Sequence, residues 1–551
     1  MHKDSTNTVR NFRENFPVTK KNAVVTLAFS RSTRVIFDHC TFRVLRRLLN
    51  LAENAALSTT CKTGRIKGVP LYCVYVNLNK RKSSQAGSAV LRRIIDWSTV
   101  QDVKVYNCTR ETLDYVATNA VKALHLTIHG GLYVPFLQPR GCGDEMIRLT
   151  RGLPHVQSFC CEFGASLCLK DIRALTSWKN LRKLNLSDTA ISKTELVALS
   201  CCGMIEEASL KLSCHEDDEG CDGSGLLALA TGCKSLHTLT LYLKHEMFQN
   251  MDVVHLHPGV FGACQKLNLS IKTGDDDFPR ELDAFFAMFS AIEYLRLKIA
   301  VIENGHSVGQ MVSQCPQLKE LRLFIYESLV TDEDLESIRL PGLRLLHMYW
   351  CPSGAFGQHM YPYPRTDGLR ALLTTHRNTL EILYLRGFCL TDKDMEVIAA
   401  GGTQLRKLTV VELDANGVTD KGLAAISIET LEEFIYVCDL SRVSFTSVGV
   451  ASLARLAHDH HLRKVLFGQV SYHDYEMYIH SGDEDEDGDE TISLPYECDH
   501  FQRTVLDAVT KSLETVSTTL TRFGLPFPST CVVKCDRFYD DTYWNPKLLG
   551  E

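Results

Sequence analysis

A repeated apolar pattern constrains this chain of 551 residues more than any other feature. The pattern is L-x-x-L-x-L, in which other apolar residues replace some of the leucines. Eight clear copies lie between Leu181 and Tyr436, and weaker ones, including one assigned to Val121, Leu124 and Leu126, extend the series from Leu71 to Phe467. Fifteen starts give a mean period of about 28 residues, which is typical of stacked repeat architectures. The length alone suggests three or four domains, but the repeat predicts one continuous core of roughly 400 residues.

Each repeat predicts a short strand followed by a helix. The alternating x-L-x-L part places leucines on one face of a strand and the residues between them on the other. A polar start signal follows, most clearly at 330–332, 390–392 and 418–420, where Thr precedes Asp. We expect the Thr or Asp side chain to accept hydrogen bonds from the first turn of its helix. Stacked units of this kind place parallel strands on the concave side and helices on the convex side.

Three phrases carry a resemblance to a known family. They are Cys315-Pro316-Gln317-Leu318-Lys319-Glu320-Leu321, Gly232-Cys233-Lys234-Ser235-Leu236 and Val418-Thr419-Asp420-Lys421-Gly422-Leu423. They resemble the cysteine-containing leucine-rich repeats of F-box substrate receptors. The resemblance implies an α/β leucine-rich-repeat solenoid, or horseshoe, of about 15 repeats that binds other proteins, including substrates for ubiquitylation. The residues before Leu71 contain no Leu-Pro-x-Glu-like phrase of an F-box. A ligase adaptor with a divergent or missing F-box, bound to a ubiquitin-ligase subunit, is therefore the alternative to a plain scaffold.

The chain outside the regular repeat predicts arms, caps and loops. We expect a flexible arm at 1–22, an N-terminal cap or irregular first repeat at 23–70 with a strand at Val24–Phe29, and the solenoid at 71–470. An acidic disordered loop at 471–495 and a C-terminal capping segment at 496–551 complete the chain. Long gaps between repeat starts predict insertions at 121–156 and 343–380, and insertions in solenoids commonly fall on the binding face.

Composition narrows the class of protein. A net charge of -6 argues against a generally basic nucleic-acid binder. The 21 cysteines are fewer than a disulfide scaffold carries, and Met1–Arg34 lacks a charged-then-apolar secretory leader. We therefore expect reduced thiols in a cytoplasmic protein, with Lys80-Arg81-Lys82 leaving a nuclear address open. No apolar run is long enough for membrane insertion.

Signals for catalysis or metal binding are weak. Gly305-His306-Ser307-Val308-Gly309 matches G-x-S-x-G, with His129-Gly130-Gly131 upstream, so an esterase-like enzyme is a second alternative. Several residues separate this motif from the preceding strand, which favours a loop and a helix start instead. The candidate metal groups lack paired C-x2-C spacing; they are Cys214/His215/Cys221, Cys531/Cys535 and His458/His460/His461. We predict no enzyme activity, no metal and no cofactor.

The outward residues of the strands predict a binding face. Read as two columns along successive repeats, they form a cationic and aromatic patch in the middle of the chain. The predicted partner-binding residues are Arg296, Lys298, Arg322, Phe324, His347, Tyr349, Tyr384 and Arg386, with Trp350, Tyr361 and Tyr363 on an insertion beside them. Tyr, Trp and Arg are enriched in protein-binding hot spots, so we expect an acidic or tyrosine-compatible protein segment as the ligand. The run Asp483–Glu490 of the same chain is an intramolecular variant, and single-stranded nucleic acid is a less favoured polyanion. Ile435, Val437 and Leu466 make the far end apolar, which predicts a cover by the C-terminal tail or by a partner.

Overall fold

The computed structural model describes alternating strands and helices in two compact units. The described residues are 23–29, 71–78, 97, 100–106, 110–129, 143–162, 167–212, 223–244, 257–272, 282–299, 308–326, 332–351, 367–411, 417–438, 444–445, 448–449, 452 and 464–469. Unit 1 is formed by Met1–Leu243 and Asn250–Leu256, and unit 2 by Lys244–Gln249 and His257–Glu551. Both units repeat the strand-then-helix order that the sequence predicts.

In unit 1, an antiparallel strand opens a sheet that is otherwise parallel. Strand β1 pairs antiparallel with β2, and each later strand pairs parallel with the one before it. The elements are β1 (Ala23–Phe29), β2 (Leu71–Leu78), β3 (Asp102–Tyr106), α6 (Arg110–Asn119), β4 (His125–His129), α7 (Gly143–Gly152), β5 (Ser158–Glu162), α8 (Leu169–Leu175), β6 (Lys183–Ile191), α9 (Lys193–Leu199), β7 (Glu207–Leu212), α10 (Gly223–Gly232) and β8 (Thr238–Lys244). The strand expected at Val24–Phe29 is thus present as β1.

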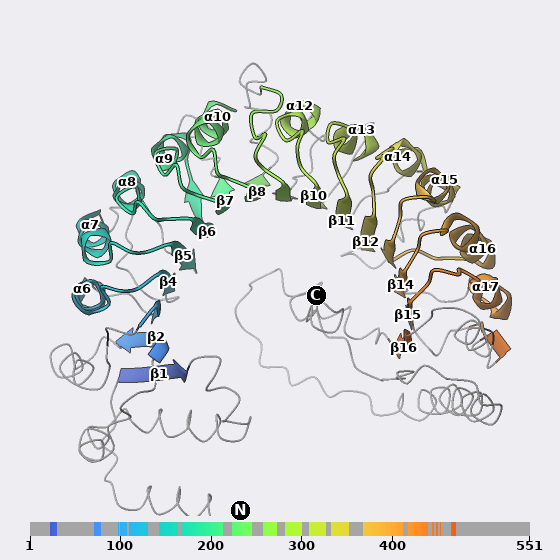
Figure 1. The fold of residues 1–551 in the computed structure, drawn as a ribbon, viewed down its shortest axis with the longest axis horizontal. Helices are drawn as coiled ribbons and strands as arrows, with labels where there is room; N and C mark the ends of the chain where they lie inside the picture. Colours follow the sequence, from blue (N-terminus) through green and yellow to red (C-terminus); the bar gives the residue numbers. More distant parts are fainter. Residues whose placement is uncertain are drawn as a thin grey trace, which may run out of the picture. The chain divides into compact units, whose positions relative to one another are not determined.

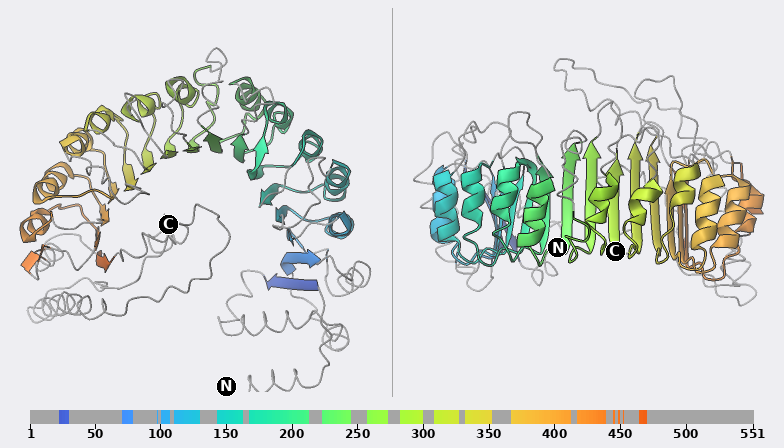
Figure 2. Two further views of the ribbon diagram at one scale, coloured as in Figure 1. Left: turned by 180° about the vertical axis from the view of Figure 1, so that it is seen from behind. Right: turned by 90° about the horizontal axis from the view of Figure 1, so that it is seen from above.

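In unit 2, the described strands are all parallel and follow chain order. The elements are β9 (Lys266–Lys272), α12 (Leu282–Ala287), β10 (Tyr294–Ile299), α13 (Val308–Ser313), β11 (Glu320–Tyr326), α14 (Asp332–Ser337), β12 (Leu345–Cys351), α15 (Asp367–His376), β13 (Ile382–Arg386), α16 (Asp392–Gly401), β14 (Lys407–Val411), α17 (Asp420–Ala425), β15 (Glu433–Cys438) and β16 (Lys464–Gln469). Within the unit, strands line the inner side of the arc and helices the outer side (Figure 1). Figure 2 shows the strands side by side with the helices as a second layer. The predicted α/β solenoid is confirmed.

The core of unit 2 lies between the sheet and the helices. Alternation along β10 turns Leu295, Leu297 and Ile299 inward, and each is at most 1% exposed. The parallel register stacks Leu295 on Leu321 of β11, and the same column continues through the later strands. Each repeat therefore buries its apolar residues against the repeats on either side. This packing makes the sheet a rigid platform for the residues on its opposite face.

One weak repeat was placed two residues too early by the sequence pattern. The hydrogen-bonded register of β3, β4 and β5 makes Ala123, Leu126 and Ile128 the inward positions of this repeat. Ala123 is fully buried, whereas Val121 is 46% exposed. The sequence pattern favours Val121 over Ala123 because valine is the more apolar residue. Pairing with the neighbouring strands nevertheless buries Ala123 and leaves Val121 exposed. As a result, Thr127, which pairs with Lys104 of β3, occupies the outward position between the last two inward residues of this repeat.

The helix starts differ in part from the expectation. Thr391 donates both its backbone N–H and its hydroxyl to Asp394, at 2.7 and 2.6 Å, which forms a capping interaction within the same helix. Asp392 instead reaches the next repeat, where it accepts hydrogen bonds from Thr419 N and Oγ1 at 2.7 and 2.6 Å and from Gly422 N at 2.9 Å. Its carboxylate therefore joins two successive repeats rather than capping its own helix.

Two glycines of unit 2 are required by close packing between neighbouring helices. A Cβ on Gly309 in α13 would lie 1.8 Å from Ser337 Oγ of α14. A Cβ on Gly422 in α17 would lie 2.4 Å from the Asp392 carboxylate. Both glycines allow one helix to approach its neighbour closely. The second glycine of the G-x-S-x-G pattern is thus accounted for by packing.

The described cysteines serve mainly as packing residues. Cys202, Cys233 and Cys315 are buried and unbridged. The Cys233 thiol donates to the carbonyl oxygens of Leu199 and Cys202, at 3.7 and 3.5 Å. Burial raises the pKa of Cys202 and of Cys315 to about 12, and that of Cys233 to about 11. These thiols stay protonated and act as small apolar side chains.

Several predictions concern residues outside the described ranges. They include the arm at 1–22, most of the cap at 23–70, the acidic loop at 471–495 and the segment at 496–551. The same holds for the following residues: Lys80–Lys82, Cys214, His215, Cys221, Ser307, Tyr361, Tyr363, His458, His460, His461, Cys531 and Cys535. These predictions remain predictions.

Candidate functional site

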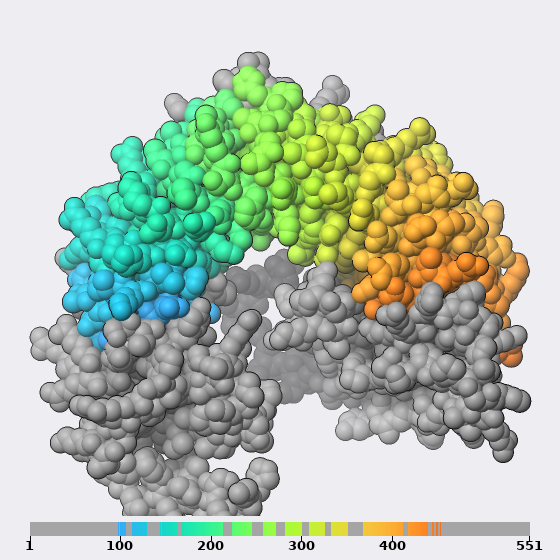
Figure 3. Space-filling model, in the orientation of Figure 1, coloured from blue at the N-terminus to red at the C-terminus, as the bar shows by residue number. Residues whose placement is uncertain are grey.

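The predicted patch lies on the inner face of unit 2, over strands β10 to β13. Parallel pairing places Arg296 opposite Arg322, Arg322 opposite His347, and His347 opposite Tyr384. A second row, two residues further along each strand, contains Lys298, Phe324, Tyr349 and Arg386. Neighbouring strands in a sheet are about 4.8 Å apart, so the eight residues form one compact surface. Figure 3 shows the repeats of this unit, coloured from green to orange, packed into a continuous wall.

Aromatic rings hold the arginines of this surface, which we call the cationic face. The guanidinium carbon of Arg296 lies 4.7 Å from the centre of the Phe324 ring, and that of Arg386 lies 4.5 Å from the Tyr349 ring. The Arg322 guanidinium lies 5.4 Å from the ring of Tyr294. Each contact is within the range of a cation–π interaction. These contacts favour a preorganised arrangement of the charged groups, which lowers the entropy lost when they bind a ligand.

The rings of the cationic face also contact one another. His347 lies between Phe324, at 5.1 Å, and Tyr384, at 3.9 Å between ring centroids. Phe324 in turn lies 5.9 Å from Tyr349. Tyr349 and Tyr384 are only 7% and 8% exposed. The rings form a packed base, and Arg296 and Lys298 are the exposed residues above it.

The cationic face is positively charged, whereas the net charge of the whole chain is negative. The outward positions of the described strands β10 to β13 carry four cations, namely Arg296, Lys298, Arg322 and Arg386. Glu320 is the one carboxylate at these positions, and its oxygen lies 3.9 Å from an Arg322 nitrogen. The formal net charge of the chain is -6. A cationic surface in an acidic protein favours binding of an anionic group at this place.

The electrostatics converge on His347. Burial lowers the pKa of its imidazole, and the charges of Arg322, Arg296 and Arg386 lower it further, to about 3. The side chain is therefore neutral at ordinary pH. Three guanidinium groups from three different strands thus lie near enough to His347 to act on its imidazole.

Trp350 does not belong to this face, and our placement of it on an insertion was wrong. It lies in β12, in register with the inward Ile325, and is 2% exposed. Strand alternation directs Tyr349 outward and Trp350 inward. The long gap after Leu343 suggested that the strand had already ended at Trp350, but β12 continues to Cys351.

Two residues that support the face were missed by the two-column alignment. Tyr294, which holds Arg322, is one outward step before the first column, so extending the same alternation by two residues would have found it. Gly387 follows Arg386 with a φ of +83°, and a Cβ there would lie 1.9 Å from the Trp350 carbonyl oxygen. This turn fixes the end of β13 and with it the position of Arg386. The sequence shows the glycine but not the contact that requires it.

The far end of the same sheet is apolar, as predicted. Ile435 and Val437 of β15 are 6% and 4% exposed, and Val411 of β14 is 4% exposed. The inner surface therefore changes from cationic at β10 to apolar and buried at β15. The predicted cover by the C-terminal tail or by a partner remains a prediction.

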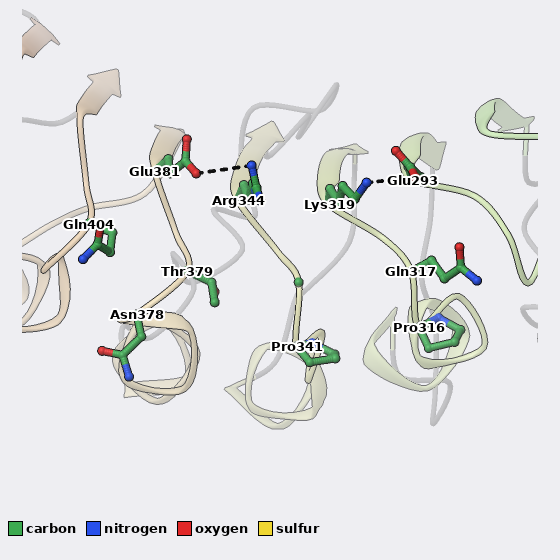
Figure 4. Close-up of a pocket in the computed structure, with 11 residues that line it drawn as sticks. Glu293, Pro316, Gln317, Lys319, Pro341, Arg344, Asn378, Thr379, Glu381 and Gln404 are labelled. Carbon is green, nitrogen blue, oxygen red and sulfur yellow. Dashed lines mark ion pairs between the residues drawn. The ribbon is translucent and has the colours of Figure 1, made fainter.

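A hollow, separate from the cationic face, lies at the edge where the strands of unit 2 begin. It has a volume of about 640 Å³ and includes Pro316, Pro341 and Gln404 in its lining. In Figure 4, Lys319 and Glu293 form an ion pair across one side, and Arg344 and Glu381 form another. Their N···O distances are 2.8 and 3.8 Å. This groove lacks the aromatic residues and the excess charge of the cationic face.

The candidate metal groups and the G-x-S-x-G motif of the sequence can be compared with the described residues. Among them, no group of three or more His, Cys, Asp or Glu side chains could hold a metal ion. Strand β10 ends at Ile299 and α13 begins at Val308, whereas a nucleophile elbow turns directly from strand to helix. This separation argues against the esterase alternative. In the same part of the chain, no helix is long and apolar enough to cross a membrane.

The repeat, the parallel register and the helical layer define the class of this protein, an α/β leucine-rich-repeat solenoid. No protein-family model matches the sequence, and no curated protein matches it.

Several solved structures resemble the fold at low identity. Toll in the Drosophila Toll–Spatzle complex is 12% identical, with a TM-score of 0.40, over 74% of this chain and 52% of that chain. An internalin of Listeria monocytogenes is 15% identical, with a TM-score of 0.30, over 68% of this chain and 92% of that one. The yeast Rad7 and Elc1 complex matches at 12% identity and a TM-score of 0.31, over 80% of this chain and 93% of that one. This chain spans about half the length of the Toll chain.

Proposed function

We propose that this protein is a non-enzymatic scaffold that binds a protein partner through the cationic face of unit 2. The observation that carries the proposal is the arrangement of four cations over a packed layer of aromatic rings on one rigid sheet. Concave surfaces of solenoids suit the binding of extended partners. Arg is enriched in protein-binding hot spots, and the nearly buried Tyr349 holds Arg386 from below. The charge of the face favours an acidic segment of the partner.

A charge reversal tests this function. The variant Arg296→Glu, Arg322→Glu and Arg386→Glu is expected to lose partners that the full chain captures from its native cell, as identified by quantitative mass spectrometry. A matched control reverses Arg339, Arg344 and Arg377, which are exposed residues of unit 2 outside the inner strands. The control should retain the partners. Thermal unfolding of both variants shows whether the solenoid is intact. If the first variant still captures every protein that the wild type does, the cationic face is not the binding site.

The resemblance of Cys315–Leu321 to repeats of F-box receptors supports a second candidate function, that of a ubiquitin-ligase adaptor. Such an adaptor would contact a ligase subunit through the residues before Leu71 and a substrate through the cationic face. Co-purification of a ligase linker subunit with the full chain, and its loss on deletion of 1–70, would support this function. Capture of substrates without any ligase subunit would leave only the scaffold.

A further inference from the structure

Building on this proposed function, we infer that the partner segment carries a phosphorylated side chain, whose phosphate binds at the centre of the cationic face between Arg296, Arg322 and Arg386. It concerns only the chemistry of the ligand, so it can be wrong while the scaffold function is right. A protein phosphate group is the single occupant that we assign to this site.

The arginines of the cationic face come from neighbouring strands. Arg296 is on β10, Arg322 on β11 and Arg386 on β13, while His347 is on β12 among them. With strands about 4.8 Å apart, the flanking arginines start within about 10 Å of β12, which is within reach of extended Arg side chains on both sides. All three charges act on the His347 imidazole. The rings beneath Arg296 and Arg386 are those of Phe324 and Tyr349, whose centroids are 5.9 Å apart. This pair of guanidinium groups is the focus of the cationic face, and Arg322, whose guanidinium lies over Tyr294, is on a strand between them. A small ligand with concentrated charge fits such a focus better than a charge spread along a chain does.

A phosphate group matches these arginines better than carboxylates do. A phosphorylated side chain places a charge of about -1.5 to -2 and three acceptor oxygens at one point. In an extended acidic peptide, carboxylates on the same face are two residues apart, or roughly 6.8 Å. Only one of them can lie at the focus, and one carboxylate cannot accept bidentate hydrogen bonds from three guanidinium groups. The charge of the three arginines is therefore matched more closely by one dianion.

Aromatic rings position the arginines for a phosphate ligand. Arg296 lies over Phe324, and Arg386 over Tyr349. A guanidinium group over a ring can still use its N–H groups, which lie in the plane of the guanidinium, to donate to oxygen acceptors. Arg suits such a site better than Lys, because its planar fork matches phosphate geometry. His347 is neutral and therefore adds no negative charge that would oppose the ligand, and Glu320, 3.9 Å from Arg322, is the one carboxylate at the outward positions of strands β10 to β13.

Fluorescence anisotropy with the full chain tests the inference directly. The probes are four degenerate nonapeptide libraries that differ only in the central residue, which is phosphoserine, phosphotyrosine, Glu or Ser. We expect at least one phosphorylated library to bind, and the Glu and Ser libraries to bind at least about tenfold more weakly. Comparison of the two phosphorylated libraries shows whether the phosphate is carried by serine or by tyrosine.

Substitutions locate the binding. The variant Arg296→Gln, Arg322→Gln and Arg386→Gln should weaken binding of the phosphorylated library at least about a hundredfold. The matched control Arg339→Gln, Arg344→Gln and Arg377→Gln changes the net charge equally and should bind like the wild type. Since Arg296 is exposed, Arg296→Gln alone should leave the fold intact and still weaken binding about tenfold.

A second readout is independent of peptide sequence. Inorganic phosphate, added as the smallest probe, should raise the pKa of His347, because a bound anion offsets the three positive charges that depress it. Nuclear magnetic resonance of the imidazole, assigned with His347→Gln, measures this change. Chloride at equal ionic strength is the control.

The outcomes separate the two proposals. Equal binding of the Glu and phosphorylated libraries, or no binding of either phosphorylated library, overturns the phosphate inference. The scaffold function still stands in that case if the charge-reversed variant loses its captured partners. Unchanged capture by that variant overturns the scaffold function itself.

Discussion

Replacing Asp392 with Ala would remove a carboxylate that ties two successive repeats of unit 2 together. Its oxygens accept three hydrogen bonds from the next repeat, from Thr419 N at 2.7 Å, Thr419 Oγ1 at 2.6 Å and Gly422 N at 2.9 Å. A net contribution of about 1 kcal/mol per hydrogen bond gives roughly 3 kcal/mol for Asp392→Ala. Asp392 is only half-buried, so water can partly replace the lost acceptor, and we expect roughly 2–3 kcal/mol.

Urea unfolding of the full chain, followed by circular dichroism, measures this loss. Amide hydrogen exchange at Thr419 and Gly422 gives a local readout, and both amides should exchange faster in the variant. Lys393→Ala is the control, because this exposed residue is on the same helix. A double-mutant cycle with Gly422→Ala adds a test of the geometry. The new Cβ would lie 2.4 Å from the Asp392 carboxylate, so its cost should fall when Asp392 is already Ala.

The pH dependence of the Asp392 contribution follows from the same contacts. Burial raises the pKa of Asp392, but the hydrogen bonds from Thr419 and Gly422 and the charge of Lys421 outweigh it, so the pKa is below the ordinary value of 3.8. A carboxylate with a lowered pKa stabilises the fold above its unfolded pKa, and that stabilisation is lost as the pH falls through the folded pKa. The difference between wild type and Asp392→Ala should therefore persist at neutral pH and shrink below about pH 4. A difference no larger than that of Lys393→Ala at neutral pH would refute the reasoning.

Three further predictions concern individual side chains. His347, whose pKa is lowered to about 3 by burial and then by the charges of three arginines, should show no titration between about pH 5 and pH 8 in nuclear magnetic resonance spectra of the free protein. Because its folded pKa lies below its unfolded one, the unfolded state gains protons first, and His347→Gln should reduce the loss of stability below about pH 6.5. Cys315, with a pKa raised to about 12 by burial, should resist alkylation by iodoacetamide in the native protein, whereas the exposed Cys201 should react; mass spectrometry of the labelled peptides would show the opposite if Cys315 were accessible. Trp350→Ala should destabilise unit 2 by about 3–5 kcal/mol in urea unfolding, whereas Tyr242→Ala, at a 40% exposed position, should cost far less. Similar costs for the two variants would contradict the inward orientation of Trp350.

The candidate site could be predicted from sequence to a useful extent because its geometry is local. In unit 2, alternation along each strand sets which residues face outward, and the repeat aligns neighbouring strands. Arg296, Arg322 and His347 therefore appeared in one column before their hydrogen-bonded register was known. Trp350 was wrongly expected on an insertion, because the length of β12 depends on its pairing with β11 rather than on its own sequence.

The repeat, the α/β solenoid and the cationic face follow from the amino-acid sequence, since a period of about 28 residues and alternation within short strands specify them. The neighbour that each polar group meets is set by the fold. It turned Asp392 toward Thr419 of the next repeat, set Arg386 over Tyr349, and placed His347 under the combined charge of three arginines. The physical reason is that hydrogen bonding, cation–π contact and pKa depend on distances across repeats. A one-dimensional pattern gives the order of those repeats but not the separation of their side chains.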